Sequence, residues 1–199
     1  MRIGILDYGV GNLYSLSCAL KKLKAEPEIV TSLNSKKFDG IMLPGVGAFD
    51  AVTKNLGKNR QLILDAVKDG VPIFGICLGM QLMFESSEEG EGDGLAIFRG
   101  SVKQLPSTVK LPHMGWNVLD KKDNHTMLDG LKAKSWAYFL HSYYPEPKDK
   151  KIVVATTNYG KDFTSAISYR NVFGTQFHPE KSGDMGSVIL RNFLKNCKK

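Results

Sequence analysis

Cysteine is scarce in this sequence, and the few cysteines show no spacing that suggests a structural role. Cys18, Cys77 and Cys197 are the three among 199 residues. Their spacing is neither that of paired cysteines in a disulfide framework nor that of metal ligands close together in the sequence. We therefore expect neither disulfides nor a zinc site, and a reducing compartment fits best.

Long apolar runs and concentrated charge are also missing. No apolar run approaches the ~20 residues that a membrane helix needs, and no charged segment followed by an apolar one marks a secretion signal. We therefore predict a cytoplasmic protein. The net charge is +7, but the lysines are scattered and do not alternate with aromatic residues, so no nucleic-acid partner is expected. A solvated basic surface or an acidic partner accounts for the charge.

What the sequence does contain, over roughly its first ninety residues, is strands alternating with helices. Apolar runs predict strands at 3–6, 28–31, 40–43 and 72–76, and apolar residues at helical spacing predict helices around Leu13 to Leu23 and Leu62 to Val67. We predict an α/β fold with an open, mostly parallel sheet and helices on both faces, of the flavodoxin-like type. Such sheets bind ligands beyond the carboxyl ends of their strands.

The second half of the sequence changes character. Short β-like segments separated by turns predict an antiparallel extension of the sheet, and an apolar face over 183–197 predicts a final helix. The length suits one domain, 1–199, because no repeat or low-complexity linker divides the chain. The predicted β-like segments are 101–105, 116–119, 136–144, 152–157, 165–169 and 172–177.

A turn typical of nucleophilic enzymes follows the predicted strand 72–76. Residues 75–79 read Gly-Ile-Cys-Leu-Gly, the pattern of an elbow in which the central residue stands on a sharp strand-to-helix turn. The glycines are needed because flanking side chains would meet neighbouring backbone. Cys77 is therefore a candidate nucleophile. The alternative is a structural cysteine buried between two packing glycines.

His178, Pro179 and Glu180 follow the last predicted strand, so they too lie at a carboxyl end of the sheet. A histidine can take a thiol proton and later protonate a leaving amine, and a carboxylate can hold the imidazole in the correct orientation. Cys77, His178 and Glu180 thus supply the three roles of a catalytic triad. Taken alone, the His-Pro-Glu segment also fits a loop with a surface histidine.

A third motif, Pro-Gly-Val-Gly at 44–47, follows the predicted strand 40–43 at the same sheet edge. Its glycines let backbone N–H groups approach a bound oxygen closely. We predict half of an oxyanion hole at Val46 and Gly47, and the other half at the N–H of Leu78, which follows the nucleophile. An ordinary strand-to-helix turn is the alternative.

Together the three motifs resemble class I, triad-type glutamine amidotransferases, in the order of that family and across nearly the whole chain. Within the class, the segments 112–117, 141–144 and 180–182 are similar to the glutaminase subunits of imidazole glycerol phosphate synthases. The resemblance implies hydrolysis of L-glutamine to glutamate and ammonia, and transfer of the ammonia to a (β/α)8-barrel cyclase subunit in histidine biosynthesis. It implies a heterodimer and no metal or organic cofactor.

The resemblance also implies roles for further residues. Several polar groups are needed to anchor the carboxylate and ammonium of an α-amino acid, and the implied glutamine-binding residues are Gly45, Gln81, His141, Ser142 and Tyr143. For the segment 141–144 the alternative is a sheet edge with an exposed histidine. The candidates for the surface that docks the cyclase are Met114, Trp116 and Lys181. The alternatives are that Met114 and Trp116 belong to the buried core and that Lys181 is a solvated surface charge.

Three other interpretations of the chain stay open. A glutaminase subunit could serve another acceptor pathway, such as pyridoxal phosphate, guanylate, anthranilate or carbamoyl phosphate synthesis, although the segment 112–117 argues against it. A cysteine hydrolase of the same architecture could act on other amides, but this leaves His178, Glu180 and Gln81 unexplained. A non-catalytic interaction module is disfavoured by the complete set of nucleophile, base and carboxylate.

Overall fold

The computed structural model describes residues 1–9, 11–33, 37–122 and 125–197. It is built on a nine-stranded sheet with the strand order β2-β1-β3-β4-β12-β11-β10-β7-β8. The first five strands in this order are all parallel, and the order of β2, β1, β3 and β4 is that of a flavodoxin-like sheet. The parallel strands are β1 (Arg2–Leu6), β2 (Glu26–Val30), β3 (Gly40–Leu43), β4 (Ile73–Ile76) and β12 (Val172–Thr175).

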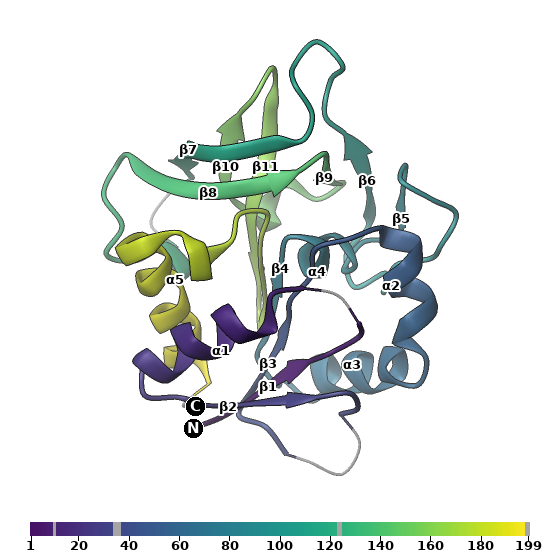
Figure 1. Ribbon diagram of the computed structural model, residues 1–199, viewed down its shortest axis with the longest axis vertical. Coiled ribbons are helices and arrows are strands. Elements are labelled where there is room, and N and C mark those ends of the chain that lie inside the picture. The colour runs from purple at the N-terminus through teal and green to yellow at the C-terminus, as the bar shows by residue number, and fades with distance from the viewer. Residues whose placement is uncertain (10, 34–36, 123–124, 198–199) are drawn as a thin grey trace.

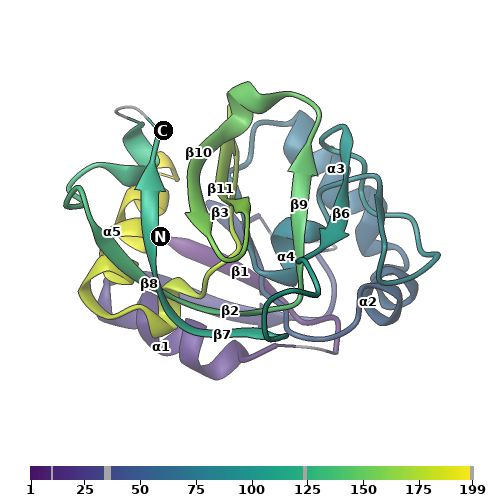
Figure 2. The ribbon, with the colours of Figure 1, turned by 90° about the horizontal axis from the view of Figure 1, so that it is seen from above.

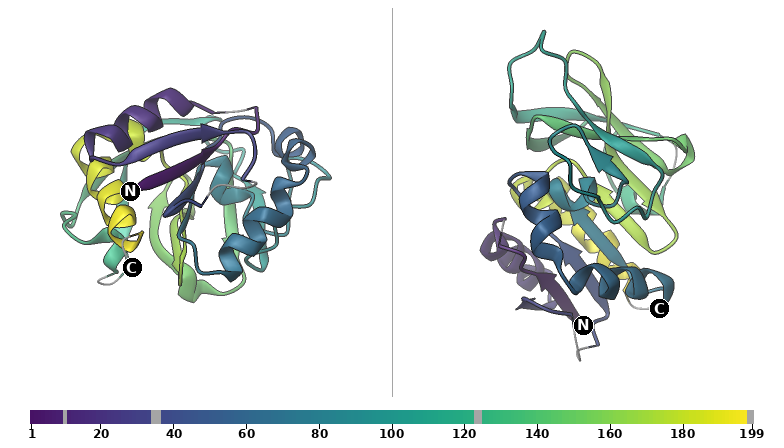
Figure 3. Two further views of the ribbon diagram at one scale, coloured as in Figure 1. Left: turned by 90° about the horizontal axis from the view of Figure 1, so that it is seen from below. Right: turned by 90° about the vertical axis from the view of Figure 1, so that its right-hand side faces the viewer.

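Helices cover both faces of the parallel strands (Figures 1 and 3). On one face, Leu16 and Leu20 of α1 belong to the same apolar core as Ile3 of β1 and Phe193 of α5. A second core contains side chains from β3, α2 and α3. Strands buried on both faces read as continuous apolar runs, which is why the sequence predicted them well. The helices are α1 (Leu13–Lys22), α2 (Phe49–Leu56), α3 (Asn59–Lys68) and α5 (Gly183–Asn196).

The second half of the chain forms the antiparallel extension, in the upper part of Figure 1. Four antiparallel strands continue the main sheet, and three others form a second, small sheet beside α4 (Leu78–Gln81), as Figure 2 shows from above. The predicted fold class is confirmed. The four strands are β7 (His113–Lys121), β8 (Ser135–His141), β10 (Val153–Asn158) and β11 (Asp162–Tyr169), and the small sheet has β5 (Ser86–Ser87), β6 (Gly100–Gln104) and β9 (Tyr143–Pro147).

The segment predicted as one strand at 136–144 is instead two strands that belong to different sheets. β8 pairs with β7 in the main sheet, whereas β9 pairs with β6 in the small sheet, and Ser142 separates them. The prediction was wrong here because Tyr143 and Tyr144 resume a β-like composition after His141 and Ser142, and only the pairing partners reveal the break. The apolar sequence at 80–84 predicts a helix after the elbow, but α4 ends at Gln81. The helix α2 was not predicted.

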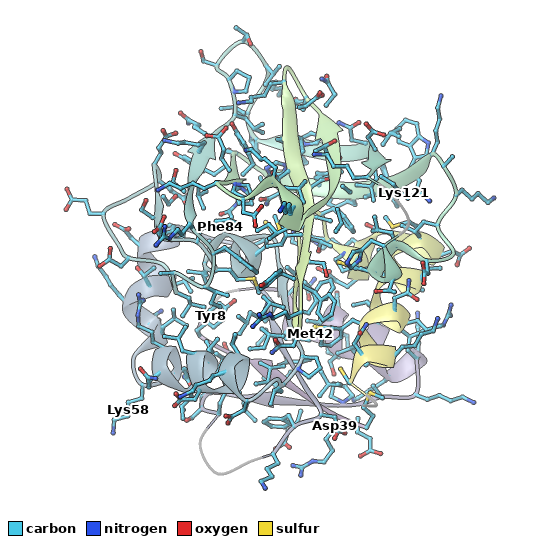
Figure 4. The ribbon with its side chains drawn as sticks, turned by 180° about the vertical axis from the view of Figure 1, so that it is seen from behind. Tyr8, Asp39, Met42, Lys58, Phe84 and Lys121 are labelled. Atoms are coloured by element: carbon cyan, nitrogen blue, oxygen red, sulfur yellow. The ribbon has the colours of Figure 1, made fainter. Side chains whose placement is uncertain are left out.

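Three short 3₁₀ helices connect these elements: η1 (Thr126–Leu128), η2 (Lys150–Ile152) and η3 (Pro179–Lys181). Lys58 and Lys121 lie far apart on the surface in Figure 4. Met42 of β3 lies between them in the same view and is buried. Within the part of the chain that the structure describes, no helix has the length and apolarity to cross a membrane.

Candidate active site

Cys77 stands on a strained turn between β4 and α4. Its backbone has φ of 53° and ψ of −108°, a region that residues with a side chain rarely adopt. A Cβ at Gly79 would overlap the carbonyl oxygen of Leu43, and one at Gly75 would come within 2.6 Å of the Gly79 backbone. Gly79 is therefore required for the turn to pack against β3, Gly75 is required for α4 to lie against the end of β4, and the turn presents Cys77 beyond the sheet edge.

His178 and Glu180 form a buried pair at the start of η3. Nδ1 of His178 lies 2.9 Å from Oε1 of Glu180, and each side chain is only 4% exposed. The backbone N–H of His178 donates to the Tyr138 carbonyl oxygen at 2.9 Å, and the hydroxyl of Ser182 donates to the His178 carbonyl oxygen at 2.6 Å. The imidazole is thus held at its backbone and at Nδ1, which leaves Nε2 available for the thiol.

The surroundings of His178 favour its charged form. Burial would lower the pKa of His178, but interactions with the Cys77 thiol and the Glu180 carboxylate outweigh burial and raise this pKa to about 10. Nε2 makes no hydrogen bond of regular geometry within the described residues, so thiol and imidazole interact without a fully formed bond. In catalytic sites such bonds are often long before substrate binds.

Two further groups contact the sulfur of Cys77. Nε2 of Gln176 donates to Sγ at 3.4 Å, and the thiol is 3.6 Å from the carbonyl oxygen of Leu140, which can accept its proton. Gln176 was not singled out from the sequence. It directly follows β12 beside the His-Pro-Glu segment, and its position there was the only signal that could have drawn attention to it.

The loop predicted to form the oxyanion hole lies against the elbow. The hydroxyl of Tyr8 donates to the carbonyl oxygen of Pro44, and the N–H of Leu78 donates to the carbonyl oxygen of Gly45 at 3.4 Å. The N–H of Leu78 is therefore engaged in this conformation, although the bond is long and weak. A small movement of the loop would free it.

A cavity of about 300 Å³ opens beside Cys77. It brings together most of the residues predicted to bind glutamine or its oxyanion, whereas Gly45 lies behind it, against Leu78. Glu89, Pro112 and Leu140 also line the cavity and were not predicted. Glu89 belongs to an acidic run that reads as a solvated loop. The cavity is lined by Val46, Gly47, Cys77, Leu78, Gln81, Glu89, Pro112, Leu140, His141, Ser142 and Tyr143.

A pair of neutral histidines supports the cavity wall. Nδ1 of His141 lies 2.8 Å from the carbonyl oxygen of Tyr143, which can only accept, so Nδ1 carries the proton. Nε2 of His141 must then accept from Nδ1 of His113 at 3.1 Å, and Asn117 donates to Nε2 of His113 at 3.3 Å. Burial lowers the pKa of His113 to about 4 and that of His141 to about 3. The contacts and burial thus agree on two uncharged rings.

The family model of class I glutamine amidotransferases matches residues 4–197 of the chain. The chain belongs to this family.

Curated relatives within the glutamine amidotransferase class I family match the chain at nearly full length. The imidazole glycerol phosphate synthase subunit HisH of Halobacterium salinarum is 47% identical, over 98% of this chain and 93% of that protein. The HisH subunit of Pyrococcus furiosus is 45% identical over 98% of each.

Among solved structures, PurLQS from Thermotoga maritima has a TM-score of 0.79 at 20% identity and covers 98% of this chain and 97% of that one. A glutamine amidotransferase from Thermotoga maritima has a TM-score of 0.75 at 16% identity and covers 100% of this chain and 99% of that one. At these identities the likeness shows the fold of the amidotransferase family alone.

Two of the three residues predicted for docking a partner, Trp116 and Lys181, lie beside Tyr138 of β8, and Met114 pairs with the next-but-one residue of that strand, Leu140. Met114 and Trp116 of β7 are 64% and 54% exposed. The Trp116 ring lies 6.0 Å from that of Tyr138, and Nζ of Lys181 lies 5.7 Å above the same ring. In this amidotransferase the β7–β8 hairpin therefore presents an apolar face that ends beside η3 and His178.

Proposed function

We propose that this chain is the glutaminase subunit of an imidazole glycerol phosphate synthase, which hydrolyses L-glutamine and supplies ammonia to a (β/α)8-barrel cyclase subunit in histidine biosynthesis. The observation that carries the proposal is the union of two findings: nearly full-length similarity to HisH subunits, and Cys77 at the wall of a cavity beside the buried His178–Glu180 pair. It requires no metal or organic cofactor.

The reaction begins with the Cys77 thiolate and the His178 imidazolium, which Glu180 holds in place. The thiolate attacks the carboxamide carbon of glutamine, and the carbonyl oxygen becomes an oxyanion. His178 then gives its proton to the nitrogen, ammonia leaves, and a γ-glutamyl thioester remains on Cys77. Water gives a proton to His178 and attacks the thioester, which releases glutamate and regenerates the thiolate.

The oxyanion is stabilised by backbone N–H groups of Val46, Gly47 and Leu78. Because the Leu78 N–H donates to Gly45 in this conformation, the loop 44–47 has to shift before the hole is complete. Docking of the cyclase is a physical route to that shift, since it would couple ammonia release to the presence of an acceptor.

Glutamine itself is held by polar groups of the cavity. Nε2 of Gln81 donates to the Tyr143 carbonyl oxygen at 2.8 Å and to Oε1 of Gln176 at 3.1 Å, so only Oε1 of Gln81 remains to accept from the substrate. Backbone of Gly45 and the segment His141 to Tyr143 complete the set. Glu89 supplies a carboxylate suited to the α-ammonium. Burial raises the pKa of the Glu89 carboxyl, and the hydrogen bond from the Phe49 N–H offsets part of this rise.

Glutamate release from glutamine by the purified chain, alone and with a cyclase subunit plus its nucleotide ligand, tests the proposal. Strong stimulation by the cyclase supports both the chemistry and the pathway. If the cyclase leaves turnover unchanged, the chain is a glutaminase but the cyclase is not its acceptor subunit. If no turnover occurs under any condition, both the glutaminase activity and the pathway are rejected.

Cys77→Ala tests the nucleophile in the same assay. The variant should fold normally, because the side chain only loses its sulfur, and glutamine turnover should fall to background because no covalent intermediate can form. Circular dichroism provides the control for folding. More than a trace of remaining turnover would reject Cys77 as the nucleophile.

The exposed residues around Tyr138 are the proposed docking surface for the cyclase. Trp116→Ala should weaken cyclase binding by ~2 kcal/mol or more, since large aromatic anchors carry much of the binding energy of interfaces. Lys181→Glu should weaken it by roughly tenfold. Lys58→Glu makes the same charge change at a distant exposed site and is the control. Calorimetry that finds Lys181→Glu equal to this control would remove Lys181 from the interface.

A further inference from the structure

Gln176 is a buried amide that reaches the reactive sulfur and has no role in the mechanism above. Its exposed fraction is 0%, and its backbone N–H donates to the Ser165 carbonyl oxygen at 2.9 Å, which fixes it at the end of β12. Its side chain makes two hydrogen bonds, one with Sγ of Cys77 at 3.4 Å and one with Gln81 at 3.1 Å.

The direction of these bonds follows from the backbone to which they are anchored. Tyr143 offers a carbonyl oxygen, which can only accept, so Gln81 must turn its amino group towards it at 2.8 Å. The same amino group faces Gln176, so Gln176 must present Oε1 to Gln81. The amino group of Gln176 is then left to face Cys77. The hydrogen-bond partners therefore determine both amide orientations.

We propose that Gln176 is a positioning residue for the nucleophile: its Nε2 donates a hydrogen bond to Sγ of Cys77, and Gln81 and the Tyr143 carbonyl hold it in that orientation. This inference rests on the proposed function, in which Cys77 attacks glutamine. A donor aimed at the sulfur favours the thiolate over the thiol. The Leu140 carbonyl oxygen, which lies 3.6 Å from the sulfur, has the opposite effect, because it accepts the proton of the thiol.

The hydrogen bond acts at two points of the reaction. It stabilises the thiolate that attacks the carboxamide, and it stabilises the same thiolate when water displaces it from the γ-glutamyl thioester. The network also links the substrate pocket to the nucleophile, because Gln81 lines the cavity and contacts Gln176. A movement of the Gln81 side chain therefore also moves Gln176, which contacts the sulfur of Cys77.

Two substitutions of Gln176 separate positioning from simple packing. Gln176→Met keeps the length of the side chain and removes the donor. Gln176→Glu keeps the shape of the amide, retains an acceptor for Gln81, and replaces the donor by a carboxylate oxygen. If the donor matters, Gln176→Glu should have the larger effect. If only packing matters, the isosteric Gln176→Glu should have the smaller effect.

The experiment measures the rate of Cys77 alkylation by iodoacetamide against pH in the full chain, with mass spectrometry of the Cys77 peptide to exclude Cys18 and Cys197. The midpoint of the profile should rise by ~1 pH unit in Gln176→Met and by more in Gln176→Glu. With the cyclase present, kcat should fall by roughly tenfold or more while KM changes little.

Asn192→Leu is the matched control, since it removes another buried amide that donates two hydrogen bonds in α5. It should lower thermal stability and leave the Cys77 profile unchanged. An unchanged profile in both folded Gln176 variants would overturn the proposal, as would a shift of equal size in the control. Alkylation needs no glutamine, so a wild-type Cys77 no more reactive than Cys18 would reject the nucleophile itself and the inference with it.

Discussion

The two buried histidine sites of this amidotransferase have opposite charge preferences. His178 is 3% exposed, and His113 and His141 are 3% and 6% exposed. The pKa of His178 is nevertheless raised to about 10, whereas that of His113 is lowered to about 4 and that of His141 to about 3. Burial lowers the pKa in all three, so burial does not explain the difference.

The difference lies in the groups that the rings contact. His178 lies 2.9 Å from a carboxylate and interacts with the sulfur of Cys77, and a carboxylate and a thiolate both stabilise an imidazolium. His141 contacts a backbone carbonyl oxygen and the ring of His113. A carbonyl oxygen holds one proton on one nitrogen, but it does not offset the cost of a buried charge. One site therefore suits proton transfer, and the other suits a fixed, uncharged wall for the cavity.

Replacing the carboxylate at the first site should have the largest effect. Glu180→Gln keeps an acceptor for Nδ1 and removes the negative charge, so the imidazolium loses one of the two groups that raise the pKa of His178. We expect kcat of glutamine hydrolysis to fall ~10²–10⁴-fold, by analogy with triads in which the acid is replaced by its amide. Steady-state assays of glutamate release check this.

Glu88→Gln is the control, because Glu88 is a carboxylate paired with Lys103 at the protein surface, with both side chains more than a third exposed. Its kcat should match that of the wild type. Equal activity of Glu180→Gln and Glu88→Gln would break the comparison, since the carboxylate would then not be what distinguishes His178.

Adding a carboxylate at the second site should make it resemble the first. Asn117→Asp replaces the amide 3.3 Å from Nε2 of His113 with a negative charge, which should raise the pKa of His113 by ~1–3 units. The NMR titration of the His113 ring checks this. The loss of the Asn117 donor to the carbonyl oxygen of the exposed residue Asn158 should also cost ~0.5–1.5 kcal/mol of stability.

Asn171→Asp makes the same change at a site where the amide donates to Val67 and Val71. It should lower stability in a similar way without moving the His113 titration. A His113 pKa that is equally low in both variants would mean that a neighbouring carboxylate does not govern the charge of these rings.

The smallest expected effect is on the pH dependence of stability. For His113 and His141 the folded pKa lies below the ordinary value near 6.5, so their contribution is present above that pH and is lost as the pH falls towards 4 and 3. Each should add up to ~1.4 kcal/mol per pH unit to the slope. For His178 the contribution is present below 6.5 and is lost as the pH rises towards 10.

Urea unfolding between pH 4.5 and pH 10 measures these slopes. His113→Phe should flatten the acid side, because the variant cannot take up the proton that the unfolded chain binds. His178→Gln should leave the acid side unchanged and alter only the alkaline side. An acid slope that is equal in wild type and His113→Phe would show that other groups dominate acid unfolding.

Much of the fold could be read from the sequence because its signals are local. The run at 40–43 lies between helices on both faces and is apolar throughout, so its strand was predicted with the bounds found. The break at Ser142 could not be read in this way. It exists because β8 and β9 find partners in different sheets, and no residue at 141–143 marks the exchange.

The residues of the candidate site likewise fall into those with a local sequence pattern and those that only tertiary contacts bring to the site. Sequence patterns alone identified the chemical groups at the ends of the strands: a thiol between glycines, an imidazole with a carboxylate two residues away, and a glycine-rich loop. The tertiary structure decided which of their neighbours matter. No sequence pattern assigned Gln176, Glu89 or His113 a role of its own, although Gln176 lies beside the His-Pro-Glu segment and His113 lies within 112–117. They reach the site because segments far apart in the chain meet at one edge of the sheet. Contacts between distant segments also set the charge of each histidine, since a pKa depends on burial and on neighbouring charges rather than on residue type alone.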